Sequence, residues 1–406
     1  MIRKERETFK VAIIGGGASG LMLATLLSQK IGGQNVALIE KNQRVGKKLL
    51  STGNGQCNFA NKNLNTANFY GENPQFSAYA IEKFGVSSLL EFYSGLGILP
   101  LLDGDKYYPY SKQASSVLDA LRFKIESLKT RVFLDLKVES VVKKDGVFEL
   151  SLSNGESVYS TNVVLAVGGK SSSYLGSDGS SYKLYQNFGH TVTGLYPSLV
   201  QLKCDAKRIR GLKGLKQKVK VTANGIAKKV AVGDVMFTDY GLSGNSIFSI
   251  SPCFAGRNGE IEIDFCPTIE KERLIEFLND KVKNCPYLTC EYLFLGIINA
   301  KISSALLRNQ GFDLTEKITS VDILKAVQCV KNYKVEILGT MGFDNSQVTR
   351  GGLRTFEFDD KTMQSKLANG LYAIGEVLDI DGDCGGYNLQ WAYSSASVAC
   401  ESIVKD

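Results

Sequence analysis

The stretch FKVAIIGGGASG occupies residues 9–20. Its first half, Phe9–Ile14, is an apolar run that predicts a buried strand, and its second half predicts a turn over Gly15–Gly20. Leu21–Lys30 has the apolar spacing of a helix, and Val36–Glu40 is a second apolar strand. This order of elements is a βαβ unit, which indicates an α/β domain.

Three glycines of this stretch, Gly15, Gly17 and Gly20, have the spacing G-x-G-x-x-G. The first glycine makes the turn, the second lets backbone approach a pyrophosphate, and the third permits close helix–strand packing. Glu40 ends the next strand 20 residues after Gly20, where a carboxylate can accept both ribose hydroxyls. The pattern predicts a dinucleotide site at the helix N-terminus; the alternative is a glycine-rich turn without a ligand.

The chain after Glu40 favours FAD over a nicotinamide cofactor. It enters a long polar loop, KKLLSTGNGQCNFAN at residues 47–61, where a nicotinamide dehydrogenase would usually continue with βα units. Near the other end, Leu371–Glu376 is a strand that runs into a glycine and an acid, as in many flavoproteins. A second G-x-G-x-x-G motif is absent. We expect non-covalent FAD, with NAD(P)H as a candidate transient electron donor.

The chain has 406 residues, more than one ordinary domain of about 150 residues. Strand patterns dominate residues 197–265, helical patterns dominate residues 268–332, and strands then return before a closing helix at about 388–404. The expected helices of the middle section are Glu270–Lys283, Tyr292–Asn309 and Ser320–Lys331. The expected domains are an FAD-binding domain from residues 1–194 and 336–406, an inserted β-rich domain at 195–266 and a helical domain at 267–335.

The composition is that of a soluble globular protein, with 44% hydrophobic and 22% charged residues. No apolar run approaches the length of about 18 residues that indicates a membrane span. Nine cysteines without a C-x-x-C pair, together with one histidine, argue against a zinc site and indicate reduced thiols in the cytoplasm. The net charge of +7 suits anionic ligands such as phosphates.

Four further segments resemble the YhiN/BaiN-type family of FAD-dependent flavoproteins. They are STGNGQCNFAN (51–61), YYPYSKQASSVLDAL (107–121), FTDYGLSGNSIFSIS (237–251) and TMQSKLANGLYAIGEVLDIDGDCGGYNLQWAYSSA (362–396). The resemblance implies a Rossmann-like FAD-binding domain formed by both chain ends, with an inserted β-barrel-like domain and a small helical domain. The family usually has arginine where this chain has Gln56, so a cation beside the cofactor or substrate is missing here.

The predicted FAD-binding residues combine the glycine motif, Glu40 and the C-terminal segment that carries the resemblance. They are Gly15, Gly17, Ala18, Ser19, Gly20, Glu40, Lys41, Lys48, Gly375, Glu376, Asp383, Gly386, Tyr387, Asn388, Leu389 and Gln390. Gly385 and Gly386 precede the last helix, and we interpret them as allowing its N-terminus to press against the ligand. No metal site is expected.

Flavin N5 itself passes the hydride, so the protein must supply position, a proton and charge compensation. Tyr387 adjoins the two glycines and is a candidate catalytic residue. Asp239 and Tyr240 are a second candidate, as a proton-donor pair.

Three other residues could have chemical roles. His190 is the only histidine, and we interpret it as a capping or packing residue. We interpret Cys57 as a structural or cofactor-lining cysteine. Arg350 has two open interpretations, since it could hold an anionic substrate or lie in solvent on a loop.

Together these patterns predict an FAD-dependent oxidoreductase that passes a hydride between flavin N5 and a small or medium organic substrate, with enone reduction as one form. The alternative is an FAD-containing RNA-associated or RNA-modifying protein, because residues 203–229 hold ten basic residues and one acid, Asp205. Lysines that block pairing at strand edges explain the same stretch, and no aromatic residue is interleaved for base stacking. A nucleic-acid partner is therefore not favoured, and no membrane partner is expected.

Overall fold

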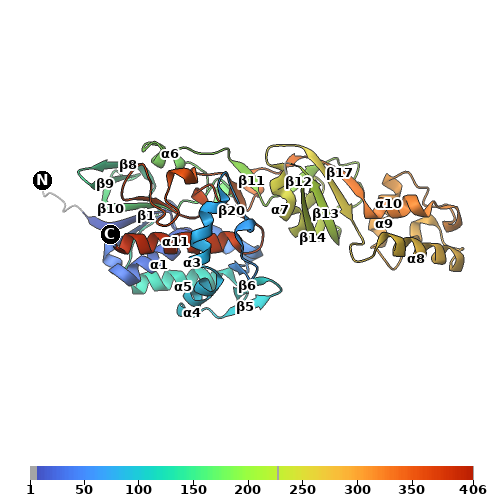
Figure 1. Ribbon diagram of the computed structural model, residues 1–406, viewed down its shortest axis with the longest axis horizontal. Helices are drawn as coiled ribbons and strands as arrows, with labels where there is room; N and C mark the ends of the chain where they lie inside the picture. The colour runs from blue at the N-terminus through green and yellow to red at the C-terminus, as the bar shows by residue number, and fades with distance from the viewer. Residues whose placement is uncertain (1–6, 226–227, 406) are drawn as a thin grey trace. The chain divides into compact units, whose positions relative to one another are not determined.

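A computed structural model describes residues 7–225 and 228–405. The chain divides into two compact units (Figure 1). Unit 1 comprises the chain up to Leu195 and again from Val348, and unit 2 comprises Tyr196–Gln347. Unit 1 is therefore assembled from both chain ends.

A seven-stranded sheet forms the centre of unit 1, in the order β7-β2-β1-β10-β9-β8, with β19 also paired to β10. β10 pairs with β9 through Ser157–Ser160 and with β19 through Val163–Leu165. The predicted α/β class with a parallel sheet is confirmed. The parallel strands are β1 (Thr8–Ile14), β2 (Val36–Ile39), β7 (Arg131–Phe133), β10 (Ser157–Leu165) and β19 (Leu371–Ala373), and the antiparallel ones are β8 (Val138–Lys144) and β9 (Val147–Leu152).

Three long helices pack together in unit 1: α1 (Ala18–Ile31), α5 (Ala114–Ser127) and α11 (Tyr387–Lys405). α1 contacts both α5 and α11, so the first and last helices of the chain lie side by side. Trp391 on α11 is buried, and its indole N–H donates to the carbonyl oxygen of Gly375 at 3.1 Å. This contact ties the last helix to the turn after β19.

Short elements complete unit 1. β3 pairs with β6 and β6 with β5, while β20 pairs with β4. The long polar loop at residues 47–61 therefore begins with a short helix and ends in β3. The elements are α2 (Lys47–Ser51), β3 (Ala60–Asn61), β4 (Phe69–Tyr70), α3 (Ala78–Lys83), α4 (Val86–Gly95), β5 (Pro100–Asp103), β6 (Lys106–Pro109), α6 (Tyr182–Gln186), β18 (Val348–Arg350) and β20 (Asp381–Gly382).

Unit 2 contains a closed six-stranded barrel and three helices. The barrel order is β12-β15-β14-β13-β16-β17. Its strands are β12 (Leu202–Cys204), β13 (Lys216–Asn224), β14 (Lys228–Phe237), β15 (Gly241–Ser243), β16 (Gly259–Asp264) and β17 (Tyr333–Thr340), and the helices are α8 (Lys271–Asn284), α9 (Ala300–Asn309) and α10 (Ile323–Lys331); β11 (Tyr196–Ser198) and α7 (Asn245–Ile250) are shorter.

The barrel and the helices of unit 2 share one hydrophobic core. A buried ion pair joins them, with Lys331 Nζ 2.7 Å from Asp264 Oδ2. The expected domain boundary at residue 336 falls inside β17, which closes the barrel between β16 and β12. The helix expected from Tyr292 begins only at Ala300, because Gly296 has the left-handed φ of +86°. Of the described residues, none belongs to a helix that is both long and apolar enough to span a membrane.

Candidate functional site

The glycine-rich turn links β1 to α1. Gly15 has a φ of +108°, and a Cβ on it would lie 2.5 Å from the carbonyl oxygen of Ala166. A Cβ on Gly20 would lie 1.9 Å from the carbonyl oxygen of Gly15, so only glycine allows the helix this close to the strand. Gly17 differs, because its nearest neighbour would be 4.0 Å away. The turn therefore has an open face at Gly17, directly before the first helical residue.

Glu40 is 7% exposed and connects the end of β2 to this turn. Its Oε2 accepts the N–H of Gly16 at 2.8 Å, and its Oε1 accepts the backbone and side-chain N–H groups of Asn42. An ionised carboxylate has about four acceptor positions, so one position remains for a further donor. Glu40 thus shapes the turn as well as facing the pocket beside it.

A pocket lies at the ends of β1 and β2. It is lined by Ile14, Gly15, Ile39, Glu40, Lys41, Leu136, Lys137, Val138, Val167, Gly169, Gly176, Asp178, Gly179 and Ser181. Lys41 Nζ lies 2.7 Å from Asp178 Oδ2. Partial burial opposes ionisation of Asp178, but hydrogen bonds from Lys41 and Ser180 prevail and lower its pKa to about 2. The pocket therefore has a mixed lining of apolar residues and fixed charges.

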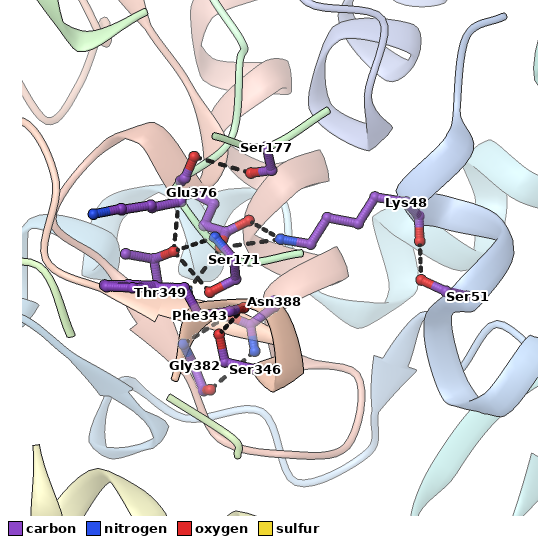
Figure 2. Close-up of polar contacts among 12 residues, drawn as sticks. Lys48, Ser51, Ser171, Ser177, Phe343, Ser346, Thr349, Glu376, Gly382 and Asn388 are labelled. Atoms are coloured by element: carbon purple, nitrogen blue, oxygen red, sulfur yellow. Dashed lines mark hydrogen bonds and ion pairs between the residues drawn. The ribbon is translucent and has the colours of Figure 1, made fainter. Parts of the chain in front are cut away.

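Glu376 is the centre of a polar network that joins four segments of unit 1 (Figure 2). Lys48 Nζ lies 2.9 Å from Glu376 Oε2, and the Thr349 N–H donates to Glu376 Oε1 at 2.8 Å. Thr349 Oγ1 accepts the N–H groups of Lys170 and Ser171 at 2.7 and 3.0 Å. Several independent contacts thus fix the position of the carboxylate.

Gly375 brings this network to the start of α1. Its φ is +70°, and a Cβ on it would lie 2.8 Å from Ser19 Oγ. The Gly375 N–H donates to Ser395 Oγ of α11 at 3.0 Å. The predicted residues Ser19, Gly375 and Glu376 therefore lie together, although they are far apart in the sequence.

The turn before α11 is held by its own side chains. Asn388 Oδ1 accepts the Gly382 N–H at 2.8 Å, and Asn388 Nδ2 donates to the carbonyl oxygen of Gly382 at 2.9 Å. Asp383 accepts hydrogen bonds from Tyr70 OH and Asn68 Nδ2, both at 3.1 Å. The side chains of Asn388 and Asp383 therefore fix the turn before α11.

The family comparison agrees with the resemblance in the sequence. Residues 9–402 match the family described as "HI0933-like protein Rossmann domain". The chain belongs to this family.

Two relatives of this HI0933-like chain have assigned activities. A 3-dehydro-bile acid delta(4,6)-reductase of Clostridium scindens is 35% identical over 402 residues, which cover 96% of this chain and 98% of the relative. A ribosomal RNA dihydrouridine synthase of Escherichia coli is 30% identical over 406 residues, which cover 98% of both. The quinol fumarate reductase structure of E. coli shares the fold, with a TM-score of 0.50 and 15% identity over 98% of this chain and 70% of that one. The chain is an oxidoreductase.

The three predicted catalytic residues of this HI0933-like protein are divided between the two units. Tyr387 in unit 1 is 7% exposed, and its ring contacts Phe69 edge-on with centroids 6.2 Å apart. Asp239 and Tyr240 lie in unit 2, in the turn between β14 and β15. Asp239 is exposed, and the hydrogen bond from Lys213 at 3.0 Å lowers its pKa. A lowered pKa keeps this carboxylate ionised at neutral pH, which disfavours proton donation.

His190 has the environment of a packing residue. Its Nδ1 lies 2.9 Å from Glu357 Oε2 and its Nε2 2.8 Å from Ser365 Oγ, and its ring stacks on Phe358. Burial lowers its pKa. The neutral ring therefore joins two segments of unit 1.

Two further interpretations concern Cys57 and Arg350. Burial raises the pKa of the Cys57 thiol to about 12, so the reactive thiolate is not available at neutral pH.

Arg350 donates to Asp381 through Nε at 3.0 Å and through Nη2 at 3.2 Å, and its guanidinium covers the Tyr70 ring. Arg350 is therefore tied to a buried carboxylate rather than fully solvated.

Sequence reasoning missed Thr349, which orients Glu376, and the buried Asp379. Burial raises the pKa of Asp379 to about 6. Both residues stand beside recognised motifs, but their partners are distant in the sequence, so local patterns do not identify them.

Proposed function

We propose that this oxidoreductase binds FAD and reduces a carbon–carbon double bond conjugated to a carbonyl group in a small or medium organic molecule. The observation that carries the proposal is the contact between the glycine-rich turn and the Gly375–Glu376 segment, in a chain 35% identical to a bile acid reductase. The name of the E. coli relative also describes addition of two hydrogens, to uridine. Bound FAD would supply the hydride.

The residues present fit a dinucleotide. Gly17 leaves room at the helix start, and the N–H groups of Ala18, Ser19 and Gly20 make no hydrogen bond within the described residues. Such groups, with the helix dipole, favour a pyrophosphate. The charges of Lys41 and Lys48 are partly offset by their ion pairs with Asp178 and Glu376, while Glu40 retains an acceptor position for a ribose hydroxyl. Glu376, held by Lys48 and Thr349, would face the ribityl chain.

Protonation of the substrate is assigned to three candidates. Tyr387 is supported by its position at the start of α11. Tyr240, 37% exposed, is the stronger member of the unit 2 pair, because Asp239 is an ion-paired, exposed carboxylate. We propose NAD(P)H as a transient electron donor. Because the G-x-G-x-x-G motif occurs once in the sequence, NAD(P)H would bind without a separate nucleotide-binding domain.

The proposed function is tested on the purified protein. Acid treatment should release FAD, and reduced protein should be reoxidised anaerobically by a 4-ene-3-keto steroid faster than by a saturated ketone. Oxygen and quinones are compared in parallel. Release of FMN, or reoxidation by quinones or oxygen but by no enone, would contradict the proposal. Reduction by NADH or NADPH under the same conditions tests the donor.

RNA modification is a second candidate function, favoured by the outer face of β13. Lys216, Lys218 and Lys220 are exposed and alternate with buried Val219 and Val221. β13 pairs with β14 along its whole length but with β16 only from Lys220 to Asn224, so protection of a free edge does not explain Lys220 and applies only to Lys216 and Lys218. A mobility shift with total tRNA and ribosomal RNA at two salt concentrations tests this candidate, because phosphate contacts give steep salt dependence.

A further inference from the structure

The barrel of unit 2 leaves part of β14 without a neighbouring strand on one side. β14 pairs with β13 from Lys228 to Met236, which is most of its length. On its other side it pairs with β15 only at Met236 and Phe237. From Lys228 to Gly233, β14 therefore has an edge that no strand covers within the described part of the chain.

The backbone groups at this edge are assigned from the residues that follow them in β14. The N–H and the carbonyl oxygen of Phe237 bond to the residues just before β13, on the β13 side. Those of Asp234 face the other way, because they bond to two side chains at the start of α7, both at 2.7 Å. Successive residues of an antiparallel strand direct these groups to alternate sides. The N–H and carbonyl groups of Val230 and Val232 therefore point out of the open edge.

Val230 and Val232 also present apolar side chains to solvent. Their exposed fractions are 52% and 60%, and no described residue forms a hydrogen bond with their outward backbone groups. β8, the last strand of the unit 1 sheet, has instead the exposed charges of Glu139, Lys143 and Lys144. Charged side chains protect a free edge from pairing with another chain. The middle of the β14 edge lacks this protection.

A second copy of this chain would match the β14 edge in one register. With a two-fold axis at Ala231, antiparallel β14 strands would place Val230 of each copy opposite Val232 of the other. This pairing uses every backbone group that Val230 and Val232 direct outward. It would also place Lys228 opposite Asp234 of the other copy, so that unlike charges meet at both ends of the paired segment.

Neighbouring registers fit less well. Moving the axis to Val230 would set the apolar side chain of Val232 against Lys228. Moving it to Val232 would require the backbone groups of Asp234, which the side chains of α7 already occupy. The axis at Ala231 is the register that satisfies the backbone groups, the valines and the charges together.

We propose that the β14 edge is an interface between two copies of this chain, paired through Val230–Val232 about an axis at Ala231. The exposed valines of the two copies cover one another on the outer face of the joined sheets. The interface lies in unit 2 and does not depend on the cofactor or the substrate proposed for unit 1.

The test measures the mass of the full-length protein by sedimentation over a range of concentrations. The paired segment is short, so we expect a reversible dimer whose average mass rises from one chain towards two as the concentration increases. Val232→Lys buries a charge among the valines twice in each dimer, and it should raise the dissociation constant about tenfold or more. The matched control Val142→Lys changes a valine of β8 that is 55% exposed and should leave the dissociation constant unchanged.

The register is tested by exchanging charges. Lys228→Asp and Asp234→Lys should each weaken the dimer, because each sets like charges together at both ends of the paired segment. The double variant restores unlike charges and should recover most of the wild-type affinity. Amide hydrogen exchange reports on the backbone, and exchange in residues 228–234 should slow as the protein concentration rises.

Several results would overturn the proposal. A wild-type protein of single-chain mass at every concentration has no such interface, and a dimer that Val232→Lys does not weaken uses another surface. A double charge variant as weak as the single ones would contradict the register. A mass increase that requires added tRNA would assign the β14 face to nucleic acid. Thermal unfolding shows whether the variants are folded, and Val232→Thr, which keeps the branched shape but adds a polar group, replaces Val232→Lys if the latter is not.

Discussion

Two helices of unit 1, α1 and α11, begin directly after glycines, but the glycines serve different purposes. A Cβ on Gly17, before α1, would meet nothing closer than 4.0 Å. A Cβ on Gly386, before α11, would lie 2.4 Å from the backbone carbon of Ala60. One glycine has open space beside it, whereas the other is required by the neighbouring chain. The same sequence signal therefore accompanies open space at one helix and close packing at the other.

The largest expected effect tests the packing side of this comparison. Gly386→Ala would force a Cβ into the Ala60 backbone at a φ of +101°, so the free energy of unfolding should fall by about 4 kcal/mol. Urea unfolding monitored by circular dichroism measures this loss. A variant as stable as wild type would show that β3 can move away, and the contrast with Gly17 would disappear.

The second effect concerns the carboxylate that supports the turn before α1. Glu40→Arg leaves the N–H groups of Gly16 and Asn42 without their acceptor, and it should weaken FAD binding by about 3 kcal/mol. Glu40→Gln keeps an acceptor oxygen and should lose far less affinity. Titration of the apoproteins with FAD measures both. Equal affinity in wild type and both variants would remove Glu40 from the site.

The contributions to stability of two carboxylates, one near each helix start, should also change with pH in opposite directions. Burial raises the pKa of Asp379, ahead of α11, to about 6, above its unfolded value of 3.8. Its contribution to stability is therefore fully present below pH 3.8 and lost as the pH rises through 6. Asp379→Asn should be more stable than wild type by about 2 kcal/mol at pH 8, and this advantage should vanish at pH 4.

Asp178, beside the pocket near α1, is the control for this pH effect. The pKa of Asp178 is lowered to about 2, so its contribution is present above pH 3.8 and lost as the pH falls through 2. Asp178→Asn should therefore lower stability at pH 8. Unfolding curves of both variants are recorded at both pH values. A stability change of the same sign for the two variants would contradict the opposite directions assigned to the two pKa shifts.

The smallest expected effect tests the open side of the comparison. Gly17 has an ordinary extended backbone, with φ −78° and ψ −166°, and the methyl group of the Gly17→Ala variant would have open space. Stability should change by no more than about 0.5 kcal/mol, while FAD affinity should fall about tenfold because the pyrophosphate approaches this atom. Thermal unfolding of the apoprotein and FAD titration separate the two. A destabilised apoprotein would place Gly17 in the same class as Gly386.

Local patterns were sufficient for the βαβ opening and for the last helix. β2 is an uninterrupted apolar run, β1 is one from Val11 to Ile14, and α1 has a 3.6-residue repeat, and these patterns depend only on neighbouring residues. The return of strand patterns after residue 332 was also predicted, and it includes β17, but a strand has the same pattern in either sheet. Its membership of the barrel follows from pairing with β16 and β12, which are distant in the sequence.

The candidate site was predicted less completely than the fold, because its details depend on long-range contacts. Glu40 and Glu376 follow strands at positions that motifs identify. The raised pKa of Asp379 and the contact of Gly386 with Ala60 each require two segments that meet only after folding. Asp239 and Tyr240 were selected from a family segment, and the structure places them in unit 2.

The assembly of unit 1 from both chain ends has a consequence for biosynthesis. Unit 2 is one continuous segment, Tyr196–Gln347, so all of its residues are synthesised before those of β19 and α11. Domains generally fold in the order of their synthesis, and unit 1 must wait for its last strand and helix. The nascent chain thus has a complete insertion attached to an incomplete host until β19 and α11 have been made.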